Sequence, residues 1–243
     1  MTTATNGRKL RILGFGAHPD DLEISCGGTL AKYQQLGHQV IMGVACVGDK
    51  GHREIPPEEL AKIRIEESNR AGAYLNAPVY NLGFKDGEIL EQDLATRWKV
   101  VDLIRRADPD VIITHHPADY HADHVAVSRL AVDASFMVSV PHIRTEFPAI
   151  HKVPQIYFMD NYAGVNFTPS EYVDVTKTFS LKEQMLGEHL SQINWLKDHD
   201  NMDIMEFIRI CGRFRGFQCG VGYAEGFVRY ISSLRVTPER LLP

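Results

Sequence analysis

Two clusters of histidine and aspartate residues contain the side chains best suited to chemistry. The first, His18-Pro19-Asp20-Asp21, follows an apolar run at residues 12–15. The second follows an apolar run at residues 111–113 and contains His115, His116, Asp119, His121, Asp123 and His124. Imidazole nitrogens and carboxylate oxygens are common zinc ligands, and a catalytic zinc keeps one position open for water or substrate. The two clusters therefore predict a catalytic metal site.

The two adjacent carboxylates of the first cluster suggest a division of labour. Asp20 and Asp21 cannot both point at one ion, so one is expected to bind metal and the other to act as a general base toward a water molecule. Their spacing does not say which does which. Hydrolysis is the reaction class that this pair favours. The alternative is structural: His18 stabilises a turn and one aspartate caps the following helix.

The second cluster offers a ligand and an acid. His121 and His124 are three residues apart, so at the start of a helix they lie on neighbouring faces, and Asp123 is placed to orient one imidazole. A solvated turn rich in polar residues is the alternative. The isolated histidines are assigned structural roles: His38, His142, His151, His189 and His199.

The composition narrows the class of protein. The chain has 243 residues and a formal net charge of -5 without a basic stripe, which argues against nucleic acid or an anionic membrane as the main partner and favours a small molecule. The four cysteines form no CxxC pair, which fits a reducing compartment. The polar N-terminal segment lacks the apolar core of a signal peptide, and no stretch is long enough to span a bilayer, so a cytoplasmic protein is expected.

Apolar runs that alternate with amphipathic segments predict a Rossmann-like α/β fold, a mostly parallel sheet flanked by helices. We expect a single domain over residues 1–243, with a flexible N-terminus at 1–8. The expected strands are residues 10–15, 39–47, 79–82 and 111–114, and the expected helices are 28–35, 57–75 and 94–107. Ligands of such folds bind at the carboxyl ends of the strands, where both clusters fall.

The second half of the chain is less regular. A helix is expected from residue 123 to about 137, and prolines at 141, 148 and 154 then predict a loop that can act as a lid, before the segment 155–159. Helical spacing of apolar residues covers 179–197, and the tail from Asp203 combines a second helix with a glycine-rich stretch.

A dinucleotide-binding module is a competing interpretation, because Gly14-Phe15-Gly16 follows a strand as the Rossmann fingerprint does. Pro19 occupies the third glycine position, however, and Asp20 and Asp21 would repel a pyrophosphate. The fingerprint is therefore incomplete.

The two clusters resemble the motifs of a known family, the PIG-L/LmbE-like zinc-dependent N-deacetylases, which remove acetyl groups from N-acetylglucosamine-containing and related compounds. Ala17-His18-Pro19-Asp20-Asp21 with Gly27-Gly28-Thr29 resembles the first motif, and His121-Ala122-Asp123-His124 the second. Weaker similarities extend over nearly the whole chain, at Arg64-Ile65-Glu66-Glu67, His189-Leu190-Ser191-Gln192 and Tyr223-Ala224-Glu225.

The resemblance implies a role for each residue of the site. His18, Asp21 and His124 would bind zinc, Asp20 would be the general base, and His121 would stabilise the tetrahedral intermediate or protonate the leaving amine, with Asp123 tuning His121. Iron or another divalent ion can replace zinc in such a ligand set. The implied substrate is a small N-acetylated amino sugar or glucosaminyl conjugate, and the implied assembly is a homo-oligomer.

Two arginines are candidates for substrate binding. Arg53, in a glycine-containing loop after the second strand, and Arg64, in the next helix, can each reach a hydroxyl, carboxylate or phosphate of a ligand, or can instead form surface ion pairs. Tyr120 receives no role. Two other functions stay open: an amidase acting on a non-acetyl amide, such as a thiol conjugate or antibiotic precursor, and a non-catalytic metal-binding protein.

Overall fold

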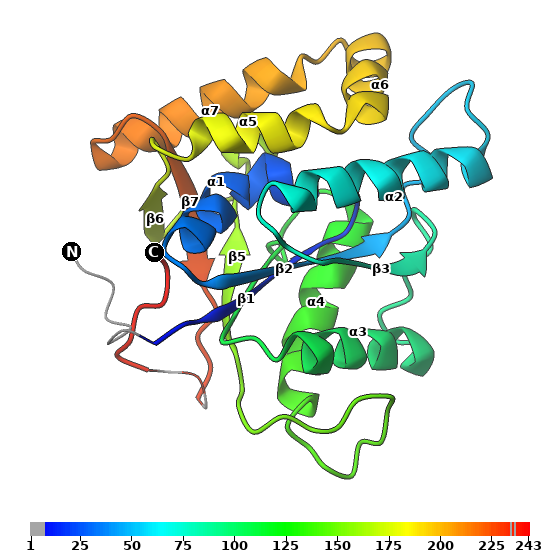
Figure 1. Ribbon diagram of the computed structural model, residues 1–243, viewed down its shortest axis with the longest axis vertical. Helices are drawn as coiled ribbons and strands as arrows, with labels where there is room; N and C mark the ends of the chain where they lie inside the picture. The colour runs from blue at the N-terminus through cyan, green and yellow to red at the C-terminus, as the bar shows by residue number, and fades with distance from the viewer. Residues whose placement is uncertain (1–7, 234, 236) are drawn as a thin grey trace.

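One seven-stranded sheet organises the computed structural model, which describes residues 8–233, 235 and 237–243 (Figure 1). The strand order is β3-β2-β1-β4-β5-β7-β6. The first five strands are parallel: β1 (Arg11–Gly16), β2 (Gln39–Cys46), β3 (Val79–Phe84), β4 (Val111–Thr114) and β5 (Gln155–Met159). This confirms the mostly parallel α/β sheet. The expected flexible N-terminus falls almost entirely on residues 1–7, which lie outside the described residues.

The helices lie in two layers, one on each face of the sheet (Figure 1). One layer holds α3 (Leu94–Ala107) and α4 (Ala122–Met137). The opposite layer holds α1 (Asp21–Gln35), α2 (Pro57–Ala73), α5 (Phe179–Gly187), α6 (Leu190–Asp200) and α7 (Ile204–Cys219). No described helix is both long enough and apolar enough to cross a membrane.

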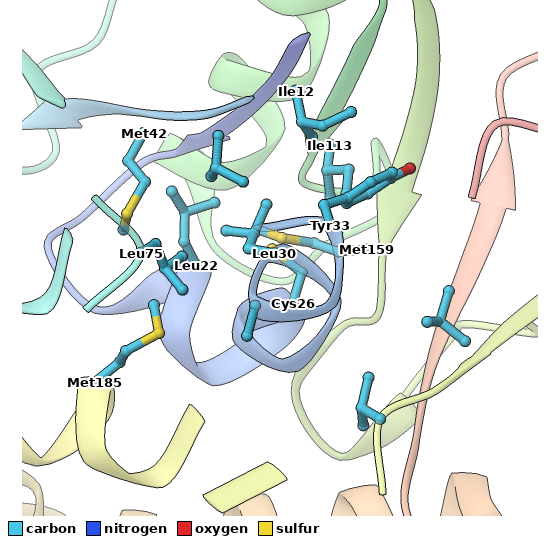
Figure 2. Close-up of a cluster of buried hydrophobic side chains, with 14 of the residues drawn as sticks. Ile12, Leu22, Cys26, Leu30, Tyr33, Met42, Leu75, Ile113, Met159 and Met185 are labelled. Carbon is cyan, nitrogen blue, oxygen red and sulfur yellow. The ribbon is translucent and has the colours of Figure 1, made fainter. Parts of the chain in front are cut away.

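The central strands are buried on both faces, as their continuous apolar runs predict. Along β1, Ile12 packs into the core beneath α1 while Leu13 packs into the core beneath α3 and α4. Figure 2 shows Leu22, Cys26 and Leu30 of α1 gathered near Ile12 of the sheet. Burial of an aliphatic side chain contributes about 1.5–3 kcal/mol, so this packing holds α1 firmly against β1.

Helix α1 begins at Asp21, seven residues before the expected start at Gly28. The two glycines in its middle have a packing function. A Cβ at Gly28 would lie 2.8 Å from Cβ of Val175, so only glycine permits this close approach. The expectation of a later start was wrong because α1 already begins at Asp21 and continues through both glycines, which are weak helix formers but are required here by tight packing.

The helical segment expected at 179–197 is two helices, α5 and α6, which meet at His189, where ψ is 55°. Glu67 of α2 stabilises the break, since its carboxylate accepts hydrogen bonds from the amide and hydroxyl of Ser191 at 2.8 and 2.6 Å. Periodicity alone could not reveal a break that depends on a residue from another helix.

The proline-containing loop at 138–154 has no helix or strand, as expected, but it is not a lid. It joins the end of α4 to the start of β5 and therefore lies at the amino edge of the sheet, away from the strand ends where ligands bind (Figure 1). Arg105 fixes the loop through hydrogen bonds from its guanidinium to the carbonyls of Val138, Val140, Ile143 and Phe147.

Two strands at one edge of the sheet were not expected. The expected second helix of the tail is α7, and the glycine-rich stretch after it forms β7 (Ala224–Arg229), which runs antiparallel between β5 and the short strand β6 (Glu171–Asp174). Along the chain, β5 and β6 are separated by a 3-10 turn, η1 (Tyr162–Gly164).

Candidate metal and catalytic site

The two polar clusters meet because the strands that precede them are neighbours. β1 pairs with β4, and Phe15 lies opposite Thr114 at the end of the ladder. The chain leaves both strands side by side at the carboxyl edge of the sheet. As a result the rings of His18 and His121 have centroids 4.7 Å apart, although their clusters are distant in the sequence.

An unusual backbone conformation separates the two aspartates. Asp20 has φ 108° and ψ -24°, a left-handed conformation that costs a non-glycine residue about 1–3 kcal/mol. Its carboxylate makes no capping hydrogen bond to α1, so the interpretation of Asp20 as a helix cap was wrong. The Asp21 carboxylate instead accepts the His18 amide at 2.6 Å. The turn therefore directs consecutive carboxylates toward different partners.

Asp21 lies among three imidazoles. Its Oδ2 is 3.5 Å from Nδ1 of His18 and 3.1 Å from Nε2 of His115, and its Oδ1 is 3.3 Å from Nε2 of His124. Burial raises the pKa of Asp21, but the charge of His124 outweighs it and holds this pKa well below its usual value. The carboxylate is therefore ionised and can bind a cation.

The donor set fits a zinc ion. Two ligands that each lie about 2.1 Å from a tetrahedral ion are themselves about 3.4 Å apart, which matches the distances from Asp21 to His18 and His124. His124 belongs to two groups of potential metal ligands, and within each group the ligand atoms lie within 4.8 Å of one another. The first group adds His18 and His121, and the second adds Asp21 and His115. The expected set of His18, Asp21 and His124 takes members from both groups.

Asp119 supports His124 from the other side. Its Oδ1 lies 3.2 Å from Nδ1 of His124. Burial lowers the pKa of His124, but the carboxylates of Asp21 and Asp119 raise it to about 9. Two carboxylates that attract a proton this strongly form a site that also attracts a metal cation. Asp119 has no role in the sequence-based assignment, although it belongs to the second cluster.

His121 is the capping residue immediately before α4, and its Nε2 is left for the site. Its Nδ1 accepts the amide of Asp123 at 3.2 Å. Burial, with His18 and His124 nearby, lowers the pKa of His121, so its imidazole is neutral at pH 7. A neutral imidazole that accepts at Nδ1 carries its proton on Nε2, and this N–H remains available to a ligand.

Asp123 orients His18 rather than His121. Its Oδ2 is 3.1 Å from Nε2 of His18 and accepts the amide of Gly87 at 2.7 Å. Only the backbone amide of Asp123 makes a hydrogen bond to the imidazole of His121, although the charge of the carboxylate also acts to raise the pKa of that imidazole. The tuning of His121 by Asp123 stays a prediction. The helix start turns the Asp123 side chain back toward β1, and Nδ1 of His18 is then left to face Asp21.

Arg64 lies beneath the turn instead of in a ligand-binding position. Its side chain is buried, and Nη2 donates to the Pro19 carbonyl at 2.5 Å and lies 3.4 Å from Oδ1 of Asp20. Arg64 therefore supports the turn. It is in neither of the positions expected from the sequence, against a substrate or in a surface ion pair. Burial raises the pKa of Asp20 to about 6, although the guanidinium opposes this. Arg53 is exposed, and its contact with substrate stays a prediction.

His115 also supports the turn, and the sequence-based assignment gave it no role. Its Nε2 accepts the amide of Ala17 at 3.0 Å, which ties the first cluster to the end of β4. Burial lowers the pKa of His115 to about 4, so this imidazole is neutral and able to accept. Its position immediately after a buried strand is the sequence signal that identifies it.

A buried ion pair fixes α1 from behind. Glu225 of β7 accepts the amides of Gly28 and Thr29 at 3.0 and 2.7 Å, and its Oε1 is 2.6 Å from Nζ of Lys182 in α5. This contact joins Tyr223-Ala224-Glu225, near the C-terminus, to the Gly27-Gly28-Thr29 segment of the first motif. Tyr120, at the mouth of the site, is 71% exposed, with its ring centroid 5.9 Å from that of His121.

The fold and site together define an α/β protein with a cluster of histidine and aspartate side chains, able to hold a metal ion, at the carboxyl edge of its sheet. The model of the GlcNAc-PI de-N-acetylase family matches residues 13–135, about half of the chain, and includes both clusters. The chain belongs to this family.

Several of the similar proteins are deacetylases by name. Diacetylchitobiose deacetylase of Thermococcus kodakarensis is 26% identical over 92% of this chain and 84% of its own length. The uncharacterized deacetylase YaiS of Escherichia coli K12 is 34% identical over 79% of this chain and 96% of its own length. Among solved structures, N,N'-diacetylchitobiose deacetylase of Pyrococcus horikoshii, complexed with an inhibitor, has a TM-score of 0.78 and 25% identity, covering 90% of this chain and 83% of its own.

Proposed function

We propose that this protein is a zinc-dependent hydrolase that removes the acetyl group from an N-acetylated amino sugar or glucosaminyl conjugate. The family and the names of the relatives support the reaction class. The observation that carries the proposal is the divergence of Asp20 and Asp21, which leaves one carboxylate among imidazoles and the other free of them. A structural metal site would need only the first.

His18, Asp21 and His124 are the proposed ligands, and the bound ion, zinc or another divalent metal, would polarise the acetyl carbonyl and lower the pKa of water. Asp123 and Asp119 hold two of these imidazoles in place from outside. Outer carboxylates of this kind typically contribute a factor of about 10–100 to metal affinity or activity.

Asp20 is the proposed general base. Burial places its pKa at about 6, close to neutral, where a base combines sufficient ionisation with sufficient proton affinity. Arg64 fixes the turn that holds it. The proton that Asp20 takes from water can then pass to the departing amine.

His121 is proposed to stabilise the oxyanion that forms at the acetyl carbonyl. Its Nδ1 already accepts a backbone amide, so Nε2 is the nitrogen that donates. A single donor of this kind contributes about 10²–10³ in kcat in other hydrolases. Protonation of the leaving amine, the other role that the resemblance implies, would require His121 to take up a second proton first.

The exposed Arg53 is proposed to contact the polar part of the substrate. The loop that carries it follows β2, so it starts at the same edge of the sheet as the site. A homo-oligomer and a cytoplasmic location are further parts of the proposal, which rest on the resemblance and on the composition.

The test is acetate release from N-acetylglucosamine, N,N'-diacetylchitobiose and N-acetylglucosaminyl-inositol, each incubated with the zinc-loaded and the chelator-stripped protein. We expect release that disappears on stripping and returns with zinc. Asp20→Asn should abolish release while the bound zinc, measured by atomic absorption, is retained. Asp21→Asn should lose both acetate release and bound zinc.

If the protein binds zinc tightly but releases acetate from none of these compounds, the proposed deacetylation of amino sugars is contradicted. Release from the corresponding formyl or propionyl amides alone would assign the site to a different acyl group. Full activity of Asp20→Asn would remove the proposed base.

A further inference from the structure

A second group of metal-ligating side chains meets at His18. Cys46 is the last residue of β2, and Asp86 lies in the turn after β3. A ring nitrogen of His18, Sγ of Cys46 and a carboxylate oxygen of Asp86 all lie within 4.8 Å of one another. The three residues stand at or just after the ends of neighbouring strands, β1, β2 and β3. The proposed reaction uses neither the thiol nor the carboxylate.

This group lies on the Nε2 side of the His18 ring. Nδ1 faces Asp21, whereas Nε2 is 3.1 Å from Oδ2 of Asp123. The same Oδ2 accepts the amide of Gly87, the residue after Asp86. Asp123 and the turn after β3 are therefore neighbours on this side. An ion bound here would take Nε2 and leave Nδ1 for the proposed catalytic ion.

The charges around the group favour a cation. The Asp86 carboxylate accepts two backbone amides of the loop after β2, at 2.9 and 3.2 Å, which hold it in place. Asp49, whose carboxylate accepts the amide of Asp86 at 3.0 Å, and Asp123 bring two more carboxylates. The ammonium of Lys50 is paired with Glu88 at 2.7 Å.

The thiol is buried, but its partner reaches solvent. Cys46 is a free cysteine with no exposed surface. Asp86 is half-buried, and Lys85 and Gly87 on either side of it are exposed. This turn gives an ion a path from solvent to the sulfur, which a new metal site requires.

The donor set selects the kind of metal. A thiolate favours zinc and other thiophilic ions, whereas magnesium, calcium and manganese prefer oxygen ligands. In a tetrahedral zinc site with bonds of about 2.0–2.3 Å, the ligand atoms are about 3.5 Å apart, so these three donors must close by about an ångström. That closure makes the group a weaker site than the one around Asp21.

We propose that His18, Cys46 and Asp86 form a second, weaker site for a thiophilic divalent ion and that its occupation inhibits the enzyme. The ion would replace the protons on the thiol and on Nε2 of His18, and both protons leave to solvent. The ring then loses its hydrogen bond to the carboxylate of Asp123. The inhibition rests on the proposed function, whereas the metal site does not.

Cobalt(II) tests the site without catalysis, because a cobalt–thiolate bond gives a charge-transfer band in the near ultraviolet. Metal-free protein is titrated with cobalt. We expect the first equivalent to give visible bands alone and the second to add the near-ultraviolet band. Cys46→Ser should keep the first event, lose the band and bind the second ion at least about tenfold more weakly. Cys26→Ser, at an equally buried cysteine, is the matched control and should behave like wild type.

Activity tests the inhibition. Acetate release by the wild-type protein and by Cys26→Ser should fall as zinc exceeds one equivalent, and release by Cys46→Ser should not. Magnesium at the same concentrations should inhibit none of the three proteins. Absence of the near-ultraviolet band in the wild-type protein would overturn the proposal, as would zinc inhibition that is unchanged in Cys46→Ser.

The titration also separates this proposal from the proposed function. A near-ultraviolet band that grows with the first equivalent would overturn the second site and would contradict the ligand set of His18, Asp21 and His124 as well. The band at the second equivalent in a protein that releases no acetate would support the second site and contradict the deacetylase alone.

Discussion

The guanidinium of Arg64 lies directly beneath the turn that carries Asp20, with Nη2 3.4 Å from Oδ1 of that aspartate. The same nitrogen donates to the Pro19 carbonyl, and Nη1 donates to the carbonyl of Gly48. One side chain from α2 thus links the turn after β1 to the turn after β2. This arrangement places Arg64 as a positioning residue whose effect on catalysis passes through Asp20.

Replacement of Arg64 by lysine should lower kcat by about 10–100-fold, because an ammonium cannot reproduce the three contacts of the planar guanidinium. Bound zinc and KM should change little. Steady-state kinetics with acetate detection and metal analysis measure all three. Arg70→Lys on the same helix, where the side chain is 50% exposed, is the control. A rise in KM with unchanged kcat would instead show that Arg64 binds substrate.

Alanine at Gly48 should destabilise the protein by more than alanine at Gly83. Both glycines have positive φ, 77° and 78°, so both substitutions carry about 1–2 kcal/mol of backbone strain. Only the Cβ at Gly48 would meet Arg64, 2.6 Å from Cδ, whereas the Cβ at Gly83 would meet no atom within 4 Å. Urea unfolding measures both free energies of unfolding. Equal losses would mean that Arg64 moves aside without a cost in stability, and kcat of Gly48→Ala should then fall as it does in Arg64→Lys, because Asp20 loses the same support.

Asp119→Ala should weaken zinc binding by about 10–100-fold, since the carboxylate beside Nδ1 of His124 is lost. Competition against a chromogenic chelator gives the affinity. Asp133→Ala, at an exposed position on the helix α4 that carries His124, provides the control. An unchanged affinity would remove Asp119 from the metal site and leave it as a partner of the His121 amide alone.

His38 should contribute a pH dependence of stability that is separate from the site. Its Nδ1 accepts the amide of Leu10 at 3.2 Å, and burial lowers its pKa. A lowered folded-state pKa means that the unfolded chain binds the proton first, so the free energy of unfolding falls as pH drops from about 6.5 through the lower folded value. Asn at position 38 keeps an acceptor without titrating.

The measurement for His38→Asn is urea unfolding at about pH 7.5 and about pH 5.5, on either side of the pKa of free histidine. The variant should lose less stability between the two conditions than the wild-type protein. His142→Asn, at an exposed loop position, should behave like wild type. If His38→Asn loses as much stability between the two pH values as the wild-type protein, other groups cause the pH dependence.

Much of the fold was predictable from local patterns. Four of the five parallel strands are short apolar runs buried on both faces, and β3 at the sheet edge is half-buried. The carboxyl ends of all five lie at one edge of the sheet, so the meeting of the clusters at His18 and His124 followed from topology. The strands β6 and β7 were not predictable because neither has an extended apolar run. The pairing of β7 with β5 and β6 also depends on partners far along the chain.

The details of the site depended on three-dimensional contacts. Spacing identified two carboxylates with different tasks, but the left-handed conformation of Asp20 that separates them has no sequence signal at a non-glycine residue. Sequence proximity suggested His121 as the partner of Asp123 and could not show that its carboxylate also lies within hydrogen-bonding distance of His18. Arg64 appeared surface-exposed because helix periodicity does not show that Pro19 and Gly48 cover it.

The tie between Glu225 and the amides of Gly28 and Thr29 joins chain positions that leave the ribosome far apart in time. Synthesis proceeds from the N-terminus, so the metal-binding segments emerge well before the acceptor that secures α1. Until β7 is made and inserted between β5 and β6, those two amides lack this acceptor, and the helix that begins at Asp21 is incompletely held. A truncated nascent chain would thus bear every proposed ligand yet lack a rigid metal centre.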